Sequence, residues 1–482
     1  MPSPCEDEFE RDAVDAAGDA RSKLPQPLVP LHRRALLLGC ALLVLYAIAL
    51  ACLLSKRSLW LDEILDLSVA RLTSLKSLIA YVRATPGAVP LGYFVQAASV
   101  HLLGFSAFSG RLPSALASIV SCVGIFILGR RLGLRSPLFA CVVFAICPLQ
   151  LRYSLEARSY ALALAFSIWS SVLFLQMLKR PRDFHTDLAY LVCVIAGVYT
   201  QPFSLFVPLS HLLWSLATND DRRRTSLRVA LVILVASALT LPWYLYSVTL
   251  WRHSIEATHT HGKIGIRVVP MLIRELVGAG YLGSGLAFLG VVFAIALHQC
   301  SRQAVRFLLL YLFVPVVSAI VADYVFGYFA AVRQIIFVLP PLWLLAVLGL
   351  EALMRRQWVW AIVLGLSLAI GGVLEDVKLF TRPREDWFAS ASVLERERSE
   401  GTCILFAPPA SKIYYGFFFP DLLAAECAPA DIASAKRVVL GVSPYDLNND
   451  YAPVVAQILH NGFVLQPTSS SLEPRIEVYL RR

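Results

Sequence analysis

The sequence predicts an α-helical polytopic membrane protein that carries a small C-terminal α/β domain. Hydrophobic residues make up 57% of the 482 residues, and the mean hydropathy is +0.66. Charged residues make up 16%, against about 25% in soluble domains. Long apolar runs recur from about residue 34 to residue 374 and then stop. The net charge of +10 does not indicate nucleic-acid binding, because the basic residues cluster in short loops between apolar runs.

The spacing of these basic loops predicts the topology. Basic residues recur at 130–135, 179–182, 222–224, 302–306 and 355–356. Since cytoplasmic loops are enriched in Lys and Arg, two crossings should separate each loop from the next. About eleven spans follow from this pattern: 34–54, 111–128, 136–150, 160–178, 186–202, 203–217, 228–247, 282–298, 306–322, 334–350 and 357–374. We therefore expect a transmembrane domain over 33–374, preceded by a disordered cytoplasmic tail over 1–32.

The first outer loop, 55–110, contains one further apolar run. Residues 89–104 are apolar enough to cross, but a crossing there would move every later basic loop to the wrong face. We expect in-plane helices in this loop instead; the alternative is that one of the other short spans fails to cross.

The same count of crossings places 375–482 outside the cytoplasm. That segment predicts an extracytoplasmic α/β domain, with strands near 403–406, 437–440 and 476–479 and helices over 385–398 and 452–460.

Two adjacent carboxylates, Asp62 and Glu63, follow the first apolar run and stand beside Trp60. Carboxylates at the edge of hydrocarbon are costly, so they indicate a functional site. The alternative is a solvated helix cap, because acidic residues are common at helix starts.

Four motifs, in this order and spacing, resemble the GT-C glycosyltransferases that use polyprenyl-phosphate sugars. The nearest likeness is to the protein O-mannosyltransferases, the aminoarabinose transferase and the RgtA/B/C/D-like enzymes. The motifs are Trp60-Leu61-Asp62-Glu63; Pro90-Leu91-Gly92-Tyr93 with Leu103-Gly104-Phe105 and Arg111-Leu112-Pro113-Ser114; Glu156-Ala157-Arg158-Ser159-Tyr160; and Val332-Arg333-Gln334 ahead of Leu339-Pro340-Pro341. The chain departs from the family at Gly87-Ala88-Val89 and Thr200-Gln201-Pro202, where the family often has a histidine.

The resemblance implies transfer of a sugar from a lipid phosphate to a hydroxyl, and that chemistry suggests roles for particular residues. Asp62 is the predicted base, and Glu63 orients the acceptor or replaces Asp62 as base. Arg158 and Arg333 are the predicted ligands of the donor phosphate, because guanidinium matches phosphate bidentately. Tyr93, Tyr160 and Arg111 are possible supporting residues.

Each arginine also has a structural alternative. Arg158 could pair with Glu156 or another acid, whereas Arg333 and Arg111 could anchor helix ends at the lipid headgroups. His253, His259 and His261 lie in one outer loop, but their spacing is weak evidence for metal, so no metal ligand is assigned. A divalent cation stays possible as a cofactor.

The predicted function is therefore an inverting glycosyltransferase of the inner (plasma) membrane with its site on the outer face. Its partners would be a polyprenyl-phosphate-linked sugar donor, the lipid bilayer and a glycan, lipid or protein acceptor. The alternative is a non-catalytic transporter of polyprenyl lipid or glycan, or a degenerate relative. A transporter of charged cargo should carry ionisable groups near mid-membrane, where His211 is a rare example in this chain.

The C-terminal segment also predicts a disulfide. Cys403 and Cys427 are the cysteines of the predicted outer domain, and disulfides persist in oxidising compartments. We expect them to be bonded, which requires Cα atoms within about 7 Å. The alternative is two free thiols, with Cys403 buried as a small apolar residue.

The topology can be tested with reporter fusions. A reporter fused after residue 375 should be active outside the cytoplasm, and one fused after Arg182 should be active inside, because the basic loops are retained in the cytoplasm. A cytoplasmic reporter after residue 375 would show that the number of crossings inferred from the basic loops is wrong.

Overall fold

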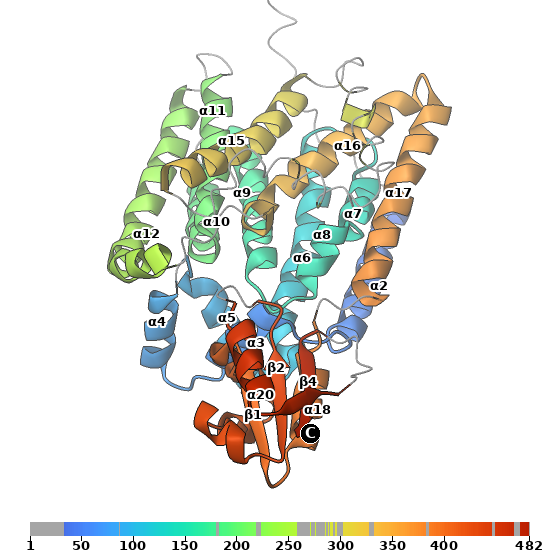
Figure 1. Cartoon of the computed structure of the whole chain (residues 1–482). Helices are drawn as coiled ribbons and strands as arrows, with labels where there is room; N and C mark the ends of the chain where they lie inside the picture. Colours follow the sequence, from blue (N-terminus) through green and yellow to red (C-terminus); the bar gives the residue numbers. More distant parts are fainter. Residues whose placement is uncertain are drawn as a thin grey trace, which may run out of the picture.

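A bundle of long helices and a small mixed-sheet domain make up the computed structural model (Figure 1). The structure describes residues 33–257, 302–326, 332–381, 385–466 and 473–481, apart from Pro86, 180–182, 218–222 and 446–448, together with scattered residues between 270 and 295. The predicted tail 1–32 and most of the predicted span 282–298 lie outside these residues, as do His259 and His261.

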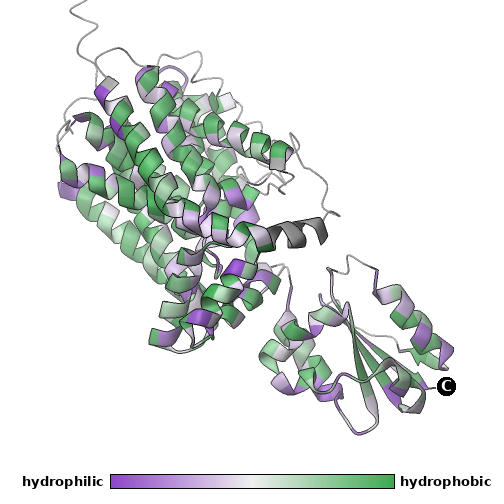
Figure 2. Ribbon diagram, turned by 90° about the vertical axis from the view of Figure 1, so that its left-hand side faces the viewer, coloured by the Kyte–Doolittle hydropathy of each residue, from purple (hydrophilic) through white to green (hydrophobic). Residues whose placement is uncertain are grey.

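The bundle is built mainly from apolar helices, with shorter and more polar ones between them. They are α2 (Arg33–Leu53), α6 (Ala107–Arg131), α7 (Pro137–Ala145), α8 (Pro148–Ser154), α9 (Tyr160–Lys179), α10 (Phe184–Thr200), η1 (Pro202–Leu205), α11 (Phe206–Leu216), α12 (Arg223–Ala257), α15 (Arg302–Phe326), η4 (Val332–Val338), α16 (Leu339–Met354) and α17 (Trp358–Thr381). Within the described residues, seven helices are long and apolar enough to cross a membrane, or eight if the bent pair α7–α8 is one span. The apolar colouring of the bundle in Figure 2 agrees with this. The protein is therefore a multi-pass membrane protein.

The predicted spans that fall on described residues coincide with these helices to within a few residues at each end, except near prolines and at the longest helices. Residues 136–150 form two helices rather than one, bent by 63° where Pro148 begins α8. Residues 186–217 form α10, η1 and α11, with Pro202 at the break. The chain between α16 and α17 turns at the end of the bundle opposite the sheet (Figure 1). Arg355 and Arg356, which form one of the basic loops, lie in this turn.

Three short helices connect α2 to α6 and lie at the same end of the bundle as the sheet (Figure 1). They are α3 (Leu61–Ala70), α4 (Leu75–Ala84) and α5 (Pro90–Leu103). The 14 residues of α5 span about 21 Å, which is short of a hydrocarbon core about 30 Å thick. This length agrees with the prediction that 89–104 does not cross.

The C-terminal domain contains a four-stranded sheet in the order β1-β2-β4-β3. Strands β1 and β2 are parallel, whereas β4 is antiparallel to both β2 and β3. The elements are α18 (Trp387–Glu397), β1 (Thr402–Ala407), η5 (Pro409–Ser411), α19 (Lys412–Phe418), η6 (Pro420–Leu423), η7 (Pro429–Ser434), β2 (Arg437–Val442), α20 (Tyr451–His460), β3 (Phe463–Leu465) and β4 (Arg475–Arg481). The three predicted strands and both predicted helices are present. The sequence reading missed β3 and α19, which are short.

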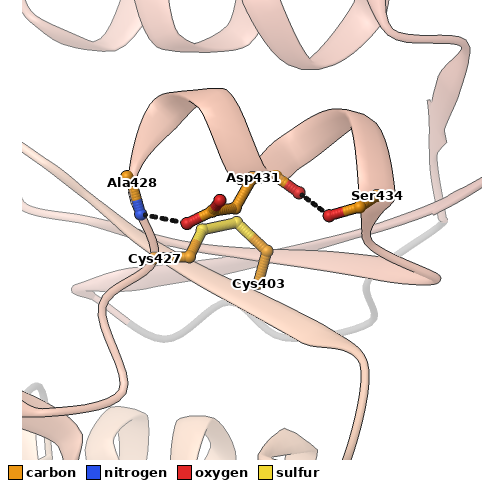
Figure 3. Close-up of a disulfide and its surroundings, with 5 residues drawn as sticks. All are labelled: Cys403, Cys427, Ala428, Asp431 and Ser434. Atoms are coloured by element: carbon orange, nitrogen blue, oxygen red, sulfur yellow. Dashed lines mark hydrogen bonds between the residues drawn. A yellow bond between two sulfur atoms is a disulfide. The ribbon is translucent and has the colours of Figure 1, made fainter.

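The predicted disulfide is confirmed. Cys403 at the start of β1 is bonded to Cys427, and their Cα atoms are 5.4 Å apart. Figure 3 shows the bond beside the short helix η7, whose Asp431 accepts a hydrogen bond from the backbone N–H of Ala428 at 3.1 Å. The bond links the first strand to the segment that leads into η7.

One hydrophobic core joins the C-terminal domain to the short helices. Leu67 on α3 and Val100 on α5 belong to the same buried cluster as Trp387, Phe406 and Tyr415 of the C-terminal domain. This face of the sheet is covered by α18, α19 and, beyond them, α3. The opposite face has its own core, formed with α20 and η7. The C-terminal domain is therefore packed onto α3, the helix that bears the acidic motif.

Candidate active site

A cavity of about 280 Å³ lies where the short helices meet the ends of the bundle helices. Its walls come from α3, the chain around Gly87–Tyr93, the segment Arg158–Tyr160, the turn at Thr200–Gln201, and the start of η4. Four charged side chains line it, namely Asp62, Asp66, Arg158 and Arg333. The two carboxylates belong to one helix, and each arginine comes from a different part of the chain.

These four side chains form one ion-pair network. Arg158 Nη1 lies 2.9 Å from Asp66 Oδ1, and its Nη2 lies 3.5 Å from Asp62 Oδ2. Arg333 Nη1 lies 4.0 Å from the same Asp62 oxygen. The exposed fraction of these side chains ranges from 11% for Asp66 to 31% for Arg333, so the network is only partly screened by water. Asp62 therefore lies between the two arginines.

Asp66 is a site residue that the sequence reading missed. It follows Asp62 by four residues, so both project from the same face of α3. Burial raises the pKa of Asp66 to about 6; Arg158 lowers this pKa, whereas the Asp62 charge raises it. Tyr93 lines the same cavity as Asp66, and its hydroxyl also lowers the pKa of Asp66. The spacing of four residues between the two aspartates is the sequence signal that could have identified Asp66 as a site residue.

Glu63 has a different environment from its neighbour Asp62. It is 1% exposed, and its two oxygens accept hydrogen bonds of 2.7 Å from Arg111 Nε and Nη2. It does not line the cavity. This corrects its expected role: the geometry assigns Glu63 to the scaffold and not to acceptor binding. Successive residues of a helix point about 100° apart, which explains how adjacent carboxylates separate in this way.

Arg111 is fully buried and uses its other donors on backbone carbonyls. Its Nη1 donates to Leu54 O at 2.8 Å and to Arg57 O at 2.9 Å, and its Nη2 donates to Ser58 O at 3.1 Å. The alternative that Arg111 anchors a helix end at lipid headgroups does not hold, because a headgroup anchor would be exposed. Arg111 instead fixes the chain between α2 and α3.

The segment that carries Arg158 is held at several backbone atoms. Ala157 N donates to Glu63 Oε1 at 2.7 Å, and Gln96 Nε2 donates to Ala157 O at 3.0 Å. Ser114 Oγ donates to Arg158 O at 2.8 Å. A Cβ at position 92 would lie only 2.5 Å from the Ser159 Cβ, so α5 can approach this segment because Gly92 has no side chain.

Tyr160 and the two departures from the family pattern also line the cavity. Arg158 lies over the Tyr160 ring at 5.5 Å and donates to its hydroxyl at 3.4 Å. Gly87-Ala88-Val89 and Thr200-Gln201, which stand where the resembling family often has a histidine, form part of the wall. Across the described part of the chain, no group of three His, Cys, Asp or Glu side chains could hold a metal ion.

The structure thus brings Asp62, Arg158 and Arg333 together with Tyr93 and Tyr160 around one cavity, and separates Glu63 and Arg111 from it. Arg158 does not pair with Glu156 but with the aspartates of α3. Glu156 is itself buried, and burial raises its pKa to about 7.

The sequence and the overall fold of the chain were compared with those of known proteins. Residues 85–246 match the family model described as dolichyl-phosphate-mannose-protein mannosyltransferase. ArnT from Cupriavidus metallidurans in the apo state is similar in structure, with a TM-score of 0.60, 15% identity, and coverage of 92% of this chain and 98% of ArnT. The chain has the GT-C fold.

Two further structures with the GT-C fold are also similar to this chain. ArnT bound to undecaprenyl phosphate gives a TM-score of 0.59 at 14% identity, covering 93% of this chain and 98% of ArnT. The Archaeoglobus fulgidus oligosaccharyltransferase in complex with Zn and sulfate gives 0.53 at 12% identity, covering 91% of this chain and 73% of that one. No curated protein sequence matches the chain. These matches confirm the predicted resemblance to the GT-C glycosyltransferases at the level of the fold.

The burial of Glu63 leads to a prediction about stability. Glu63→Gln breaks the bidentate pair and leaves the Arg111 charge buried without its counter-ion, which typically costs about 3–5 kcal/mol. We expect a lower yield of folded protein and a lower unfolding temperature in detergent. Asp62→Asn is the matched control, because Asp62 is more exposed and makes longer ion pairs. An unfolding temperature equal to that of the wild type in Glu63→Gln would contradict a scaffold role.

Proposed function

We propose that the protein is an integral-membrane glycosyltransferase that moves a sugar from a polyprenyl-phosphate donor to a hydroxyl acceptor, with inversion at the anomeric carbon. One observation carries this proposal: a single cavity holds a carboxylate, Asp62, directly beside two arginines from distant parts of the chain. An acceptor hydroxyl needs a base, and a phosphate leaving group needs cations.

Asp62 is the proposed base. It takes the proton of the acceptor hydroxyl as the oxygen forms a bond to the anomeric carbon. The bond from that carbon to the phosphate oxygen breaks at the same time, and the electron pair leaves with the polyprenyl phosphate. Attack opposite the leaving phosphate inverts the anomeric centre. The product glycoside, the lipid phosphate and the proton on Asp62 balance the reaction.

Arg158 and Arg333 are the proposed ligands of the donor phosphate. Both already lie within 4.0 Å of Asp62, so a phosphate bound between them would bring the anomeric carbon close to the base. Asp66 holds Arg158 at 2.9 Å and is proposed to aim its guanidinium at the phosphate. The Arg158 guanidinium lies over the Tyr160 ring, and we propose that this ring holds the guanidinium in a fixed orientation.

The comparisons support the class of donor. The ArnT structure at a TM-score of 0.59 is bound to undecaprenyl phosphate, and the matched family model is described as dolichyl-phosphate-mannose-protein mannosyltransferase. By analogy, we propose a polyprenyl-phosphate sugar for this chain, with a glycan, lipid or protein as acceptor. We propose the inner membrane as its location, with the tail 1–32 in the cytoplasm and the domain 375–482 outside.

The location of the charged groups favours an enzyme over a transporter. The cavity is lined in part by α3 and α5, which lie at the same end of the bundle as the C-terminal sheet (Figure 1). His211, by contrast, is buried between aromatic rings and paired with Ser171 at 3.1 Å and Tyr190 at 2.9 Å. That arrangement suits a packing role better than a path for charged cargo.

Asp62→Asn tests the base. The substitution keeps the size of the side chain and removes its charge, so the transfer rate should fall by about 10²–10⁴-fold with near-normal expression. Transfer would be measured with radiolabelled lipid-linked sugar and membranes from the expressing strain. Asp421→Asn, at a 77% exposed carboxylate in the C-terminal domain, is the control and should transfer normally. Turnover at the wild-type rate in Asp62→Asn would refute the assignment.

The pKa of Asp66 leads to a pH prediction. Above about pH 6 Asp66 is ionised and holds Arg158; as the pH falls through this value the carboxylate gains a proton and the ion pair is lost. Wild-type transfer should therefore fall about tenfold by one pH unit below this pKa. Asp66→Asn mimics the protonated form, so its rate should be low and flat over the same range. Glu156→Gln is the control, and its transfer rate should still fall as the pH is lowered. An unchanged acidic limb in Asp66→Asn would assign that ionisation to another group.

A further inference from the structure

A buried carboxylate of the C-terminal domain reaches the helix that bears Asp62. Glu385 is 3% exposed and precedes α18. Its Oε2 accepts a hydrogen bond of 3.0 Å from Leu61 N, the first backbone N–H of α3. The contact joins residues 324 positions apart in the chain. Leu61 directly precedes Asp62, so the contact lies one residue from the proposed base.

The start of α3 has no side-chain hydrogen bond from its N-cap residue. The N-cap residue is Trp60, whose side chain cannot accept a hydrogen bond as Ser, Thr, Asp or Asn would. The first N–H groups of a helix have no partner inside the helix, and its N-terminus carries a partial positive charge. Glu385 supplies both an acceptor and a negative charge at this end. Within the helix, Glu63 Oε2 accepts from the Trp60 N–H at 3.4 Å, and Glu385 accepts from Leu61 N, one position before the N–H groups that an N-cap side chain would bind.

Glu385 is itself held rigidly. The same Oε2 accepts the Trp387 indole N–H at 2.5 Å, and its Oε1 accepts the Tyr445 hydroxyl. Trp387 is fully buried in the core shared with α3. Tyr414, on α19, packs against Trp387 with the two ring centroids 4.8 Å apart and the ring planes tilted by 53°. Burial, with smaller effects of the Asp62 and Glu385 charges, raises the pKa of Tyr414 to about 12.

Further contacts dock the same domain at the other end of α3. The Arg71 guanidinium, which follows the helix, lies 3.6 Å from the Phe105 ring centroid and 4.7 Å from that of Phe417. The two rings are 5.6 Å apart. Both ends of α3 thus contact the C-terminal domain, which limits how far the helix can rotate or slide.

We infer that Glu385 is a positioning residue: from the C-terminal domain it fixes the first turn of α3, and so sets the direction in which Asp62 points into the cavity. The inference rests on the proposed function for its catalytic consequence, though not for its structural one. The arginines of the phosphate site lie on other segments and make no hydrogen bond to Glu385 among the contacts described. Loss of Glu385 should therefore affect turnover more than donor binding.

The test compares Glu385→Ala with Glu477→Ala in the full-length purified protein. Glu477 is a matched control: it is a buried carboxylate of the same domain, and it accepts hydrogen bonds from Tyr451 and Tyr479 but does not contact α3. Hydrogen exchange of the peptide that spans α3 is measured by mass spectrometry. We expect roughly tenfold faster exchange at the first turn of α3 in Glu385→Ala, and no change there in Glu477→Ala.

Kinetics provide the second readout. In Glu385→Ala, kcat should fall by about 10–100-fold while KM for the lipid-linked donor changes little, because small displacements of a reacting group are costly to the chemical step. Glu385→Gln keeps an acceptor for Leu61 N and should recover much of the rate. Tyr445→Phe removes one partner of Glu385 without touching α3 and should give an intermediate loss.

Several outcomes would overturn the inference. One is an unchanged exchange rate at α3 in Glu385→Ala, and another is equal acceleration in Glu477→Ala, which would indicate general loosening of the domain. A proportional rise in KM with constant kcat would also overturn it. If the wild type transfers no sugar, the proposed function fails, but the exchange experiment still decides whether Glu385 fixes α3.

Discussion

The buried ion pair between Arg111 and Glu63 is the interaction on which the rest of the site depends. Arg111 donates to three carbonyls of the segment between α2 and α3 and to both oxygens of Glu63, and Glu63 in turn accepts from the backbone of Ala157. Two buried charges are stable only when their remaining hydrogen bonds are satisfied, and this pair meets that condition through the backbone. Three chain segments are thereby fixed to α6. The cavity forms between these fixed segments.

The cavity itself contains a balanced set of charges. Asp62 and Asp66 face Arg158 and Arg333, so the two negative charges are matched by two positive ones. A donor phosphate that binds the arginines would compete with the carboxylates for them. Asp62 makes the longer contacts, at 3.5 and 4.0 Å, whereas Asp66 keeps its contact at 2.9 Å. We therefore expect the phosphate to displace Asp62 more readily than Asp66, which would leave Asp62 free to act on the acceptor. Such a site is preorganised, since its dipoles are already in place before the donor arrives.

The sequence predicted the helices well because lipid imposes a strong constraint. Each span must satisfy its backbone within the helix and present apolar side chains, and hydropathy reports both requirements. It also predicted that Asp62, Arg158 and Arg333 meet, through motifs that resemble a known family. It did not separate Asp62 from Glu63, because adjacent carboxylates look alike in a sequence and only the packing of Arg111 distinguishes them. Asp66 was missed for a related reason: it stands within the apolar pattern of α3, where an acidic residue reads as solvent-facing.

The contact of Glu385 with α3 illustrates what a single sequence cannot reveal. A cap is normally sought within a few residues of the helix start, and here it lies 324 residues away, in a domain that the topology alone would describe as an appendage. The shared core argues against that description. Trp387 and Tyr415 of the C-terminal domain are buried in the same cluster as Leu67 of α3, so the surfaces between the two parts are apolar and continuous. Interfaces of that kind resemble the interior of one domain more than a contact between independent ones. The C-terminal domain binds the first amide of α3, and the bundle contacts Leu67 of α3 at Gly110 of α6. With contacts to both parts, α3 has little freedom to move. The orientation of Asp62 thus depends on both parts of the molecule.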